Sequence, residues 1–151
     1  MIRVVVDRAP IDVAAEMALA ETAGVGAVAT FTGLVRADAG VAGDVETLEL
    51  EHYPGATEAA LRSLADEAVT RWALAAATIV HRVGPMRPGE RIVFVATAAP
   101  HRAAALDACA FLIDRLKTEA PFWKREVRGA TAAWVEARAG DDAASGRWIA
   151  G

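Results

Sequence analysis

The chain has 151 residues, of which 54% are hydrophobic and 24% are charged. At roughly 150 residues per domain, this length predicts a single domain over residues 1–151, and the composition excludes disordered and fibrous proteins. The net charge of -4 argues against a general nucleic-acid binder. No stretch approaches the ~18 apolar residues of a membrane span, and the apolar run near the N-terminus is too short for a signal peptide. We therefore expect a cytoplasmic protein without a membrane partner.

Cys109 is the single cysteine. It cannot form an internal disulfide, and its isolation excludes multi-cysteine zinc and iron–sulfur sites. The three histidines, His52, His81 and His101, show no spacing typical of metal ligands, so we expect no metal. Cys109 falls on the apolar stripe of a predicted helix and is therefore expected to pack in the core.

The first half of the chain alternates apolar strand patterns with helical periodicity. We predict a strand over Ile2 to Val6, a helix over Ile11 to Ala23, and strands over Val25 to Val35 and Val45 to Tyr53. The predicted inward stripe of the first helix consists of Ile11, Ala14, Ala15, Ala18 and Leu19. The loop of residues 37–43 is rich in glycine and alanine and is expected to be mobile, with its ordering on substrate binding left open.

The second half begins with an amphipathic helix predicted over Thr57 to Trp72. Strands over Ala76 to Val83 and Arg91 to Ala99 follow, joined by a turn of sequence GPMRPGE. A helix is predicted over His101 to Thr118. Its inward stripe consists of Ala105, Leu106, Cys109, Leu112, Ile113 and Leu116. A closing hairpin is predicted from residues 122–128 and 132–137, and the polar tail of residues 141–151 is expected to be mobile, with Trp148 as its anchor.

Strands and helices are interleaved, but short turns join several strand pairs. Short turns favour antiparallel pairing, because parallel strands need long crossover connections. We therefore predict an α+β fold with a mainly antiparallel or mixed sheet.

The lysines are the most informative residues in the chain. Of its 16 basic Lys and Arg residues, only Lys117 and Lys124 are lysine, and both lie in the segment KTEAPFWK. Arginine keeps its proton in proteins, whereas a lysine can lose its proton and act as a nucleophile or base. The pair indicates a site that requires amines, although chance clustering of two lysines is the simpler alternative.

Other cations stand at positions where ligands commonly bind. His101 and Arg102 open a helix, where free backbone N–H groups favour an anion such as a phosphate or carboxylate. The structural alternative is that His101 caps the helix and Arg102 faces solvent. Arg36 ends a strand beside the loop of residues 37–43, and Arg138 follows the last strand. Together these cations favour a small, multiply anionic ligand.

Helix length restricts how these groups combine. His101 and Lys117 are 16 residues apart, which at ~1.5 Å per residue is about 24 Å along one helix. One protomer cannot bring both ends to one small ligand. The hypothesis that follows is a composite site across a symmetric dimer.

Several longer strings are similar to a known family. They are FTGLVR (residues 31–36), LELEHYPG (48–55), HRVG (81–84), HR (101–102), LKTEAPFWKRE (116–126) and WVEAR (134–138). In order, and over roughly residues 2–148, they resemble the MoaE family, the large catalytic subunits of molybdopterin synthase. Ala56 departs from the family pattern, which carries methionine there.

The resemblance implies an α/β-hammerhead-type fold with an additional antiparallel β subdomain. It also implies a heterotetramer built on a homodimer of this chain, with two small ubiquitin-like sulfur-carrier subunits. The C-terminal Gly-Gly of each small subunit would carry a thiocarboxylate. The reaction implied is conversion of cyclic pyranopterin monophosphate, also called precursor Z, into the dithiolene of molybdopterin, with no cofactor on the large subunit.

The same resemblance assigns roles to residues. Lys117 matches the family's essential lysine, and Lys124 matches a second lysine of the active site. The anion-binding positions correspond to Arg36, His101, Arg102 and Arg138, and Phe31 matches an aromatic residue of the pocket. Whether Lys117 forms a covalent acyl species stays open at this point.

Two other functions compete with this one. A non-catalytic anion-binding adaptor would retain the fold and the partner surface, but loss of a lysine would be expected and both are present. A lysine-dependent aldolase would need a barrel of ~250 residues, and the chain is too short for one.

Overall fold

The structure, a computed structural model, describes residues 1–22, 24–37, 46–128, 131–135 and 148. The helices in these ranges are α1 (Val13–Ala20), α2 (Ala56–Trp72) and α3 (Arg102–Glu119). The strands are β1 (Ile2–Asp7), β2 (Ala27–Leu34), β3 (Thr47–His52), β4 (Ala76–Arg82), β5 (Gly84–Met86), β6 (Arg91–Ala99), β7 (Phe122–Arg128) and β8 (Thr131–Val135).

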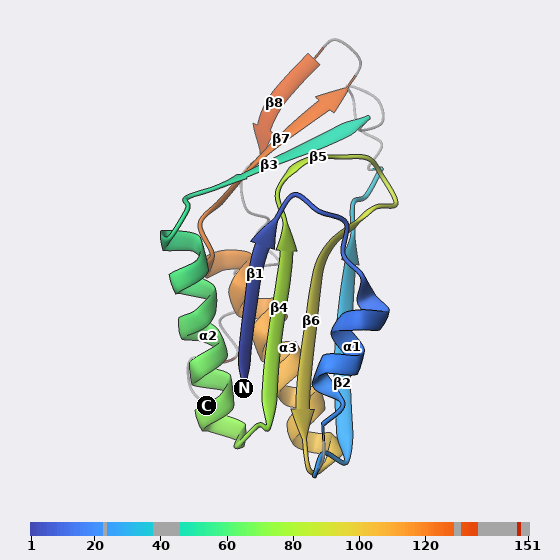
Figure 1. Cartoon of the computed structure of the whole chain (residues 1–151). Helices are drawn as coiled ribbons and strands as arrows, with labels where there is room; N and C mark the ends of the chain where they lie inside the picture. The colour runs from blue at the N-terminus through green and yellow to red at the C-terminus, as the bar shows by residue number, and fades with distance from the viewer. Residues whose placement is uncertain (23, 38–45, 129–130, 136–147, 149–151) are drawn as a thin grey trace.

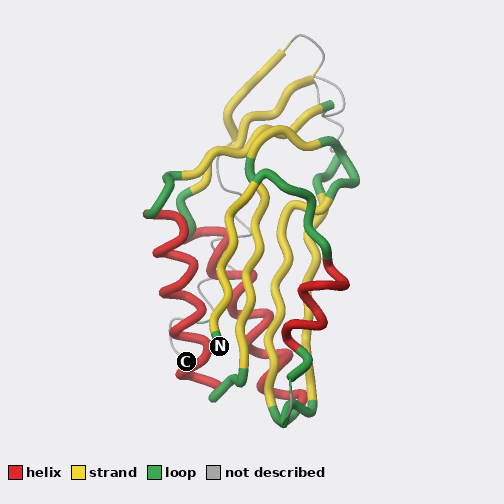
Figure 2. The backbone as a smooth tube through the Cα atoms, viewed as in Figure 1, coloured by secondary structure: helices red, strands yellow, loops and turns green. Residues whose placement is uncertain are grey.

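The strands form two four-stranded sheets. The larger sheet has the order β1-β4-β6-β2, with β1 and β4 parallel and the other pairs antiparallel. The smaller sheet has the order β5-β3-β7-β8 and is antiparallel throughout. It lies beyond one end of the larger sheet, and all three helices lie beside the larger sheet (Figures 1 and 2). The predicted α+β class, mixed sheet and additional antiparallel sheet are confirmed.

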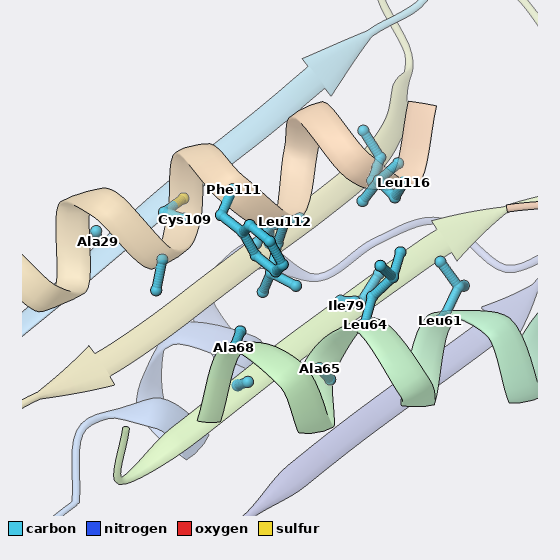
Figure 3. Packing of buried hydrophobic residues seen from close by; sticks show 14 of the residues in the cluster. Ala29, Leu61, Leu64, Ala65, Ala68, Ile79, Cys109, Phe111, Leu112 and Leu116 are labelled. Atoms are coloured by element: carbon cyan, nitrogen blue, oxygen red, sulfur yellow. The ribbon is translucent and has the colours of Figure 1, made fainter. Parts of the chain in front are cut away.

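Helices cover both faces of the larger sheet, so its central strands are buried on both sides. In β6, Val93 and Val95 pack in the cluster beneath α2 and α3. Phe94 and Ala96 pack in a second cluster with Ile11, which precedes α1, and Ala20, which ends it. This alternation follows from the two-residue period of a strand. Figure 3 shows the main cluster, in which side chains from α2 and α3 meet over the sheet.

The first helix is shorter than predicted, and its buried face is different. The structure begins α1 at Val13, because the Asp12 carboxylate accepts a hydrogen bond from the Ala15 N–H at 3.1 Å. The shift turns Val13, Glu16 and Ala20 inward, while the predicted Ala14, Ala15, Ala18 and Leu19 are exposed. The Glu16 carboxylate is satisfied by two bonds from the Arg3 guanidinium, at 2.8 and 2.9 Å.

Two further predictions need correction. Leu106, predicted on the inward stripe of α3, is 59% exposed, and Phe111 is fully buried instead. The segment GPMRPGE, predicted as a plain turn, contains β5, in which Met86 pairs with Leu48 and Gly84 with Leu50 of β3. Three residues that include proline carry no strand pattern, so only the tertiary pairing reveals this strand.

The connection from α3 into the smaller sheet places the end of the helix under that sheet. Pro121 lies between α3 and β7, and its carbonyl accepts a hydrogen bond from the Thr57 hydroxyl at 2.9 Å. Thr57 is fully buried in the first turn of α2. This bond ties the start of α2 to the point at which the chain enters β7.

Trp148 confirms its predicted role as an anchor. Its Nε1 donates to Asp114 Oδ2 at 2.7 Å, and its ring lies 5.7 Å from that of Phe111 and 5.9 Å from that of Trp72. The predicted mobility of residues 38–43 and of the rest of the tail falls outside the described residues. Among the described helices, none is long and apolar enough to cross a membrane.

Candidate functional site

The two predicted groups of cations lie at opposite ends of α3. His101 is the N-cap residue of the helix, and Lys117 lies in its last turn. In Figure 1, α3 begins at the end of the larger sheet that is farthest from the smaller sheet and ends beside the smaller sheet. The structure therefore does not bring His101 and Arg102 together with Lys117 within one chain, as the helix-length argument required.

The first end of α3 opens to solvent. A hollow of about 560 Å³ is lined there by Gly26, Pro100, His101, Arg102 and Ala103. A side chain at residue 26 would place its Cβ 2.2 Å from the Pro100 carbonyl oxygen, so only glycine allows this close approach. His101 and Arg102 are both exposed, and the His101 side chain makes no capping hydrogen bond. His101 therefore occupies the N-cap position and Arg102 faces solvent, as the structural alternative expected, but the His101 side chain does not cap the helix.

The second end of α3 brings the two lysines together. Pairing in the smaller sheet sets Lys124 opposite Leu50, and Phe122 opposite His52. Directly paired residues share a face, so these four side chains lie on the inner face of the sheet. The charges of Lys117, Lys124 and His52 all act on the buried His81. Both lysines of the chain are therefore close to one imidazole, although they come from different elements.

His81 is held neutral in this position. It is 5% exposed, and its Nδ1 lies 2.9 Å from the Arg82 carbonyl oxygen. The pKa of His81 is lowered from 6.5 to about 3, mainly by burial. The hydrogen bond to Arg82 opposes this shift, and the positive charges of Lys117, Lys124 and His52 add to it.

Aromatic rings form the walls around this group. Phe122 stacks on the His81 ring with a centroid distance of 4.0 Å and an interplanar angle of 24°. On the outer side of the smaller sheet, Tyr53 and Trp123 make an edge-to-face contact at 4.0 Å, and both are substantially exposed. The site thus has an apolar inner wall and an exposed aromatic pair outside it.

A histidine–carboxylate pair stands beside the inner wall. The Nε2 of His52 lies 3.6 Å from Oε1 of Glu58, in the first turn of α2. The other carboxylate oxygen of Glu58 accepts from the Gly55 N–H at 3.1 Å. Oε1 itself is a buried oxygen without a hydrogen-bond partner in the part of the chain that the structure describes. Glu58 therefore contributes a negative charge close to the group of cations.

The remaining predicted site residues are distributed as follows. Phe31 lies on β2, the edge strand of the larger sheet, and is 37% exposed. Arg36 is exposed just after β2. Arg138 lies outside the described residues. Phe31 and Arg36 are both exposed and are therefore accessible to a ligand or a second chain.

Cys109 offers no sulfur for chemistry. It is 6% exposed in the core, and burial raises the pKa of its thiol to about 11, with a hydrogen bond involving Thr97 acting in the opposite direction. A neutral buried thiol is a poor nucleophile. The predicted core position of Cys109 is confirmed.

Sequence reasoning did not assign His81, Glu58 or Phe122 to the site. Each looked structural: His81 ends an apolar strand, Glu58 opens a helix and Phe122 starts a strand. The sequence signals were the strings HRVG and LKTEAPFWKRE, which contain His81 and Phe122 but assigned neither residue a role. Their grouping depends on the smaller sheet, which closes over the ends of β4 and α3.

Comparison with known proteins gives a consistent result. Residues 6–119 match the family described as MoaE protein. The chain is 50% identical to the molybdopterin synthase catalytic subunit of Cereibacter sphaeroides, covering 97% of this chain and 99% of that one. It is also similar to the solved MoaE protein of Burkholderia ambifaria, with a TM-score of 0.84, 45% identity and 98% of both chains covered.

A more distant solved structure is a complex. It contains subunits 1 and 2 of the molybdopterin-converting factor of Helicobacter pylori. The TM-score is 0.74 at 18% identity, and 91% of each chain is covered. At this identity the likeness concerns the fold.

Proposed function

The chain belongs to the MoaE family, and from this we propose that it is a molybdopterin synthase catalytic subunit, a sulfurtransferase of molybdenum cofactor biosynthesis. The observation that carries the proposal is the convergence of Lys117 and Lys124, the only lysines of the chain, beside the buried His81. A site with two amines and an inert cysteine suits a reaction whose sulfur arrives on another protein.

The proposed donor is the C-terminal thiocarboxylate of a small ubiquitin-like subunit, and the acceptor is cyclic pyranopterin monophosphate. In each transfer the sulfur forms a bond to a carbon of the pterin side chain, and water then hydrolyses the acyl carbon–sulfur bond, which leaves the donor as a carboxylate. Two such transfers give the dithiolene. In this reaction Lys117 stabilises developing negative charge and moves protons at the acyl group. Lys124 supplies electrostatic support for the same charges from the inner face of the smaller sheet.

The pterin phosphate is proposed to bind at the opposite end of α3 of a second copy. His101 and Arg102 are exposed there beside free helical N–H groups, which suit an anion. Arg36, Arg138 and Phe31 are proposed to complete substrate binding. Because α3 separates His101 from Lys117, each complete site needs residues from two chains, which supports a homodimer at the centre of the heterotetramer.

The edge strand β2 supports this homodimer. It carries Phe31 and Leu34, which are 37% and 53% exposed, on the open edge of the larger sheet. Exposed apolar side chains on an edge strand favour association with another chain. We also propose a cytoplasmic location, because a thiocarboxylate donor needs a reducing compartment.

The decisive experiment is dithiolene formation from cyclic pyranopterin monophosphate with a thiocarboxylated small subunit. The wild-type chain is compared with Lys117→Arg, which keeps the charge but removes an amine that can lose its proton. We expect an active wild type and a nearly inactive variant that still binds the small subunit. A wild type that forms no dithiolene with an authentic partner would overturn the proposed function. An active Lys117→Arg chain would reduce the role of Lys117 to charge alone.

A further inference from the structure

His81 is a buried titratable residue with no role in the reaction as set out above. It lies near the end of β4, a strand in which every residue is buried. A polar ring in such a place must be satisfied by specific partners, because an unpaired buried polar group is costly. The groups that act on His81 come from four elements, β3, β4, α3 and β7.

The hydrogen bond at Nδ1 determines the tautomer of the ring. The Arg82 carbonyl oxygen, 2.9 Å away, can only accept, so Nδ1 carries the hydrogen. In the neutral ring the lone pair is then on Nε2. The imidazole is thereby fixed in orientation against the backbone of its own strand.

Burial keeps His81 uncharged, and the charges around it act in the same direction. Lys117 from α3, Lys124 from β7 and His52 from β3 all lower its pKa, and Glu58 from α2 lies beside His52. With a pKa of about 3, the ring carries no charge at any pH near neutrality. A protonated imidazole in its place would add another cation to the lysine pair.

The ring also connects two parts of the fold. It stacks on Phe122, which shares the inner face of the smaller sheet with Lys124 two residues further along β7. The stack therefore joins the end of β4, in the larger sheet, to the strand that carries Lys124. Movement of Phe122 would move Lys124 relative to Lys117 on α3.

We propose that His81 is a positioning residue of the sulfur-transfer site, whose neutral ring holds Phe122, and through it Lys124, in place beside Lys117 without adding positive charge. The inference rests on the proposed function, because the position of the two lysines affects activity only if they take part in the sulfur-transfer reaction. His81 does not itself exchange protons with the substrate in this proposal.

The test compares two substitutions in the complex with the thiocarboxylated small subunit. His81→Leu and His81→Phe are both neutral and both lose the bond to Arg82, but only phenylalanine keeps a ring for Phe122 to stack on. We expect His81→Leu to lower kcat about tenfold or more and His81→Phe to stay within about threefold of the wild type, a loss in the range typical of misplaced catalytic groups. KM for the pterin and affinity for the small subunit should change less than about twofold in both.

Several outcomes would overturn the inference. One is equal kcat for the leucine and phenylalanine variants, and another is a change confined to KM. If the His81 variants do not fold, Phe122→Leu and Phe122→Tyr make the same comparison from the other ring, with the leucine variant expected to lose kcat. A ring that titrates near pH 6.5 in ¹⁵N NMR spectra of the wild type would contradict its neutrality.

The failure of this inference differs from that of the proposed function. If the wild type is active and the paired variants behave alike, only the role of His81 is wrong. If the wild type forms no dithiolene, the proposed function itself is wrong.

Discussion

The two ends of α3 present cations in different surroundings. His101 and Arg102 at the first end are exposed beside an open hollow, where water and salt screen their charges. Lys117 at the other end is half-buried and lies near the neutral His81 and the inner face of the smaller sheet. Exposed cations suit the capture of an anion, whereas partly desolvated amines suit the stabilisation of charge that develops during a reaction. This difference fits the proposed function, which assigns binding to one end and chemistry to the other.

After the near-complete loss expected for Lys117→Arg, the next largest effect is expected from Lys124→Ala, at the end proposed for chemistry. Loss of this amine should lower kcat about 100-fold, as expected for one electrostatic donor in a desolvated site. Arg125→Ala is the matched control, because Arg125 is the next residue, is exposed and pairs with Glu49 on the other face of β7. Its activity should stay within about twofold of the wild type. Equal losses in steady-state dithiolene assays would show that the two faces of β7 do not differ in function.

The second effect concerns stability in acid. Since the pKa of His81 is lowered to about 3 in the folded chain from 6.5, its contribution to stability is present above pH 6.5 and is lost as the pH falls toward 3. Between pH 7 and pH 5 this loss is about 2 kcal/mol. His81→Phe should show a correspondingly smaller fall in the free energy of unfolding, measured by urea denaturation at both pH values. The same pH dependence in both proteins would place the acid sensitivity in other groups.

Substitutions at the end of α3 that carries His101 and Arg102 should change the affinity for the pterin. Arg102→Ala is expected to raise KM for the pterin about tenfold, the loss typical of one charge-assisted hydrogen bond, while kcat changes little. Arg62→Ala is the control, because Arg62 is an exposed arginine on α2. At pterin concentrations well below KM, mixing Arg102→Ala chains with Lys117→Arg chains should give about a quarter of the wild-type activity, because half of the dimers are mixed and half of the sites in each mixed dimer are intact. No recovery on mixing would rule out a composite site.

The smallest effect is expected at Cys109, which lies between the two ends of α3. Cys109→Ala should leave kcat within about twofold of the wild type and cost about 1 kcal/mol of stability through lost apolar contact. In the wild type, the thiol should resist a thiol-specific reagent at pH 8, because burial raises its pKa to about 11. Rapid modification of Cys109 in the folded chain, with loss of activity, would contradict an inert core thiol.

Strongly periodic elements were predicted well from the sequence. The helix expected over Thr57 to Trp72 and the strand over 122–128 match α2 and β7 almost residue for residue. Their apolar spacing is clear, and turn residues bound them. The predicted buried face of the first helix was wrong, because its many alanines fit several helical phases. The Asp12 cap starts the helix at Val13 and so fixes a different phase. The strand β5 was not predicted, because only its pairing with β3 defines it.

Some residues of the candidate site were likewise predicted from the sequence, and others were not. Lys117 and Lys124 were found from the sequence because amines are rare in this chain and both lie in one segment. His81 and Phe122 were not found, because nothing local distinguishes a buried histidine near an active site from one in an ordinary core. The two residues come together only because their rings stack across strands of different sheets.

The sequence by itself determined the family, the α+β class, the two lysines of the proposed site and the separation of the two ends of α3. These properties are local, since they follow from residue type, periodicity and the fixed rise of a helix. Only the tertiary structure decided that β7 turns Lys124 inward, that the smaller sheet covers the end of α3, and that His81 becomes a neutral residue between cations. Burial and charge at a residue depend on segments far apart in the chain, and folding alone brings those segments together.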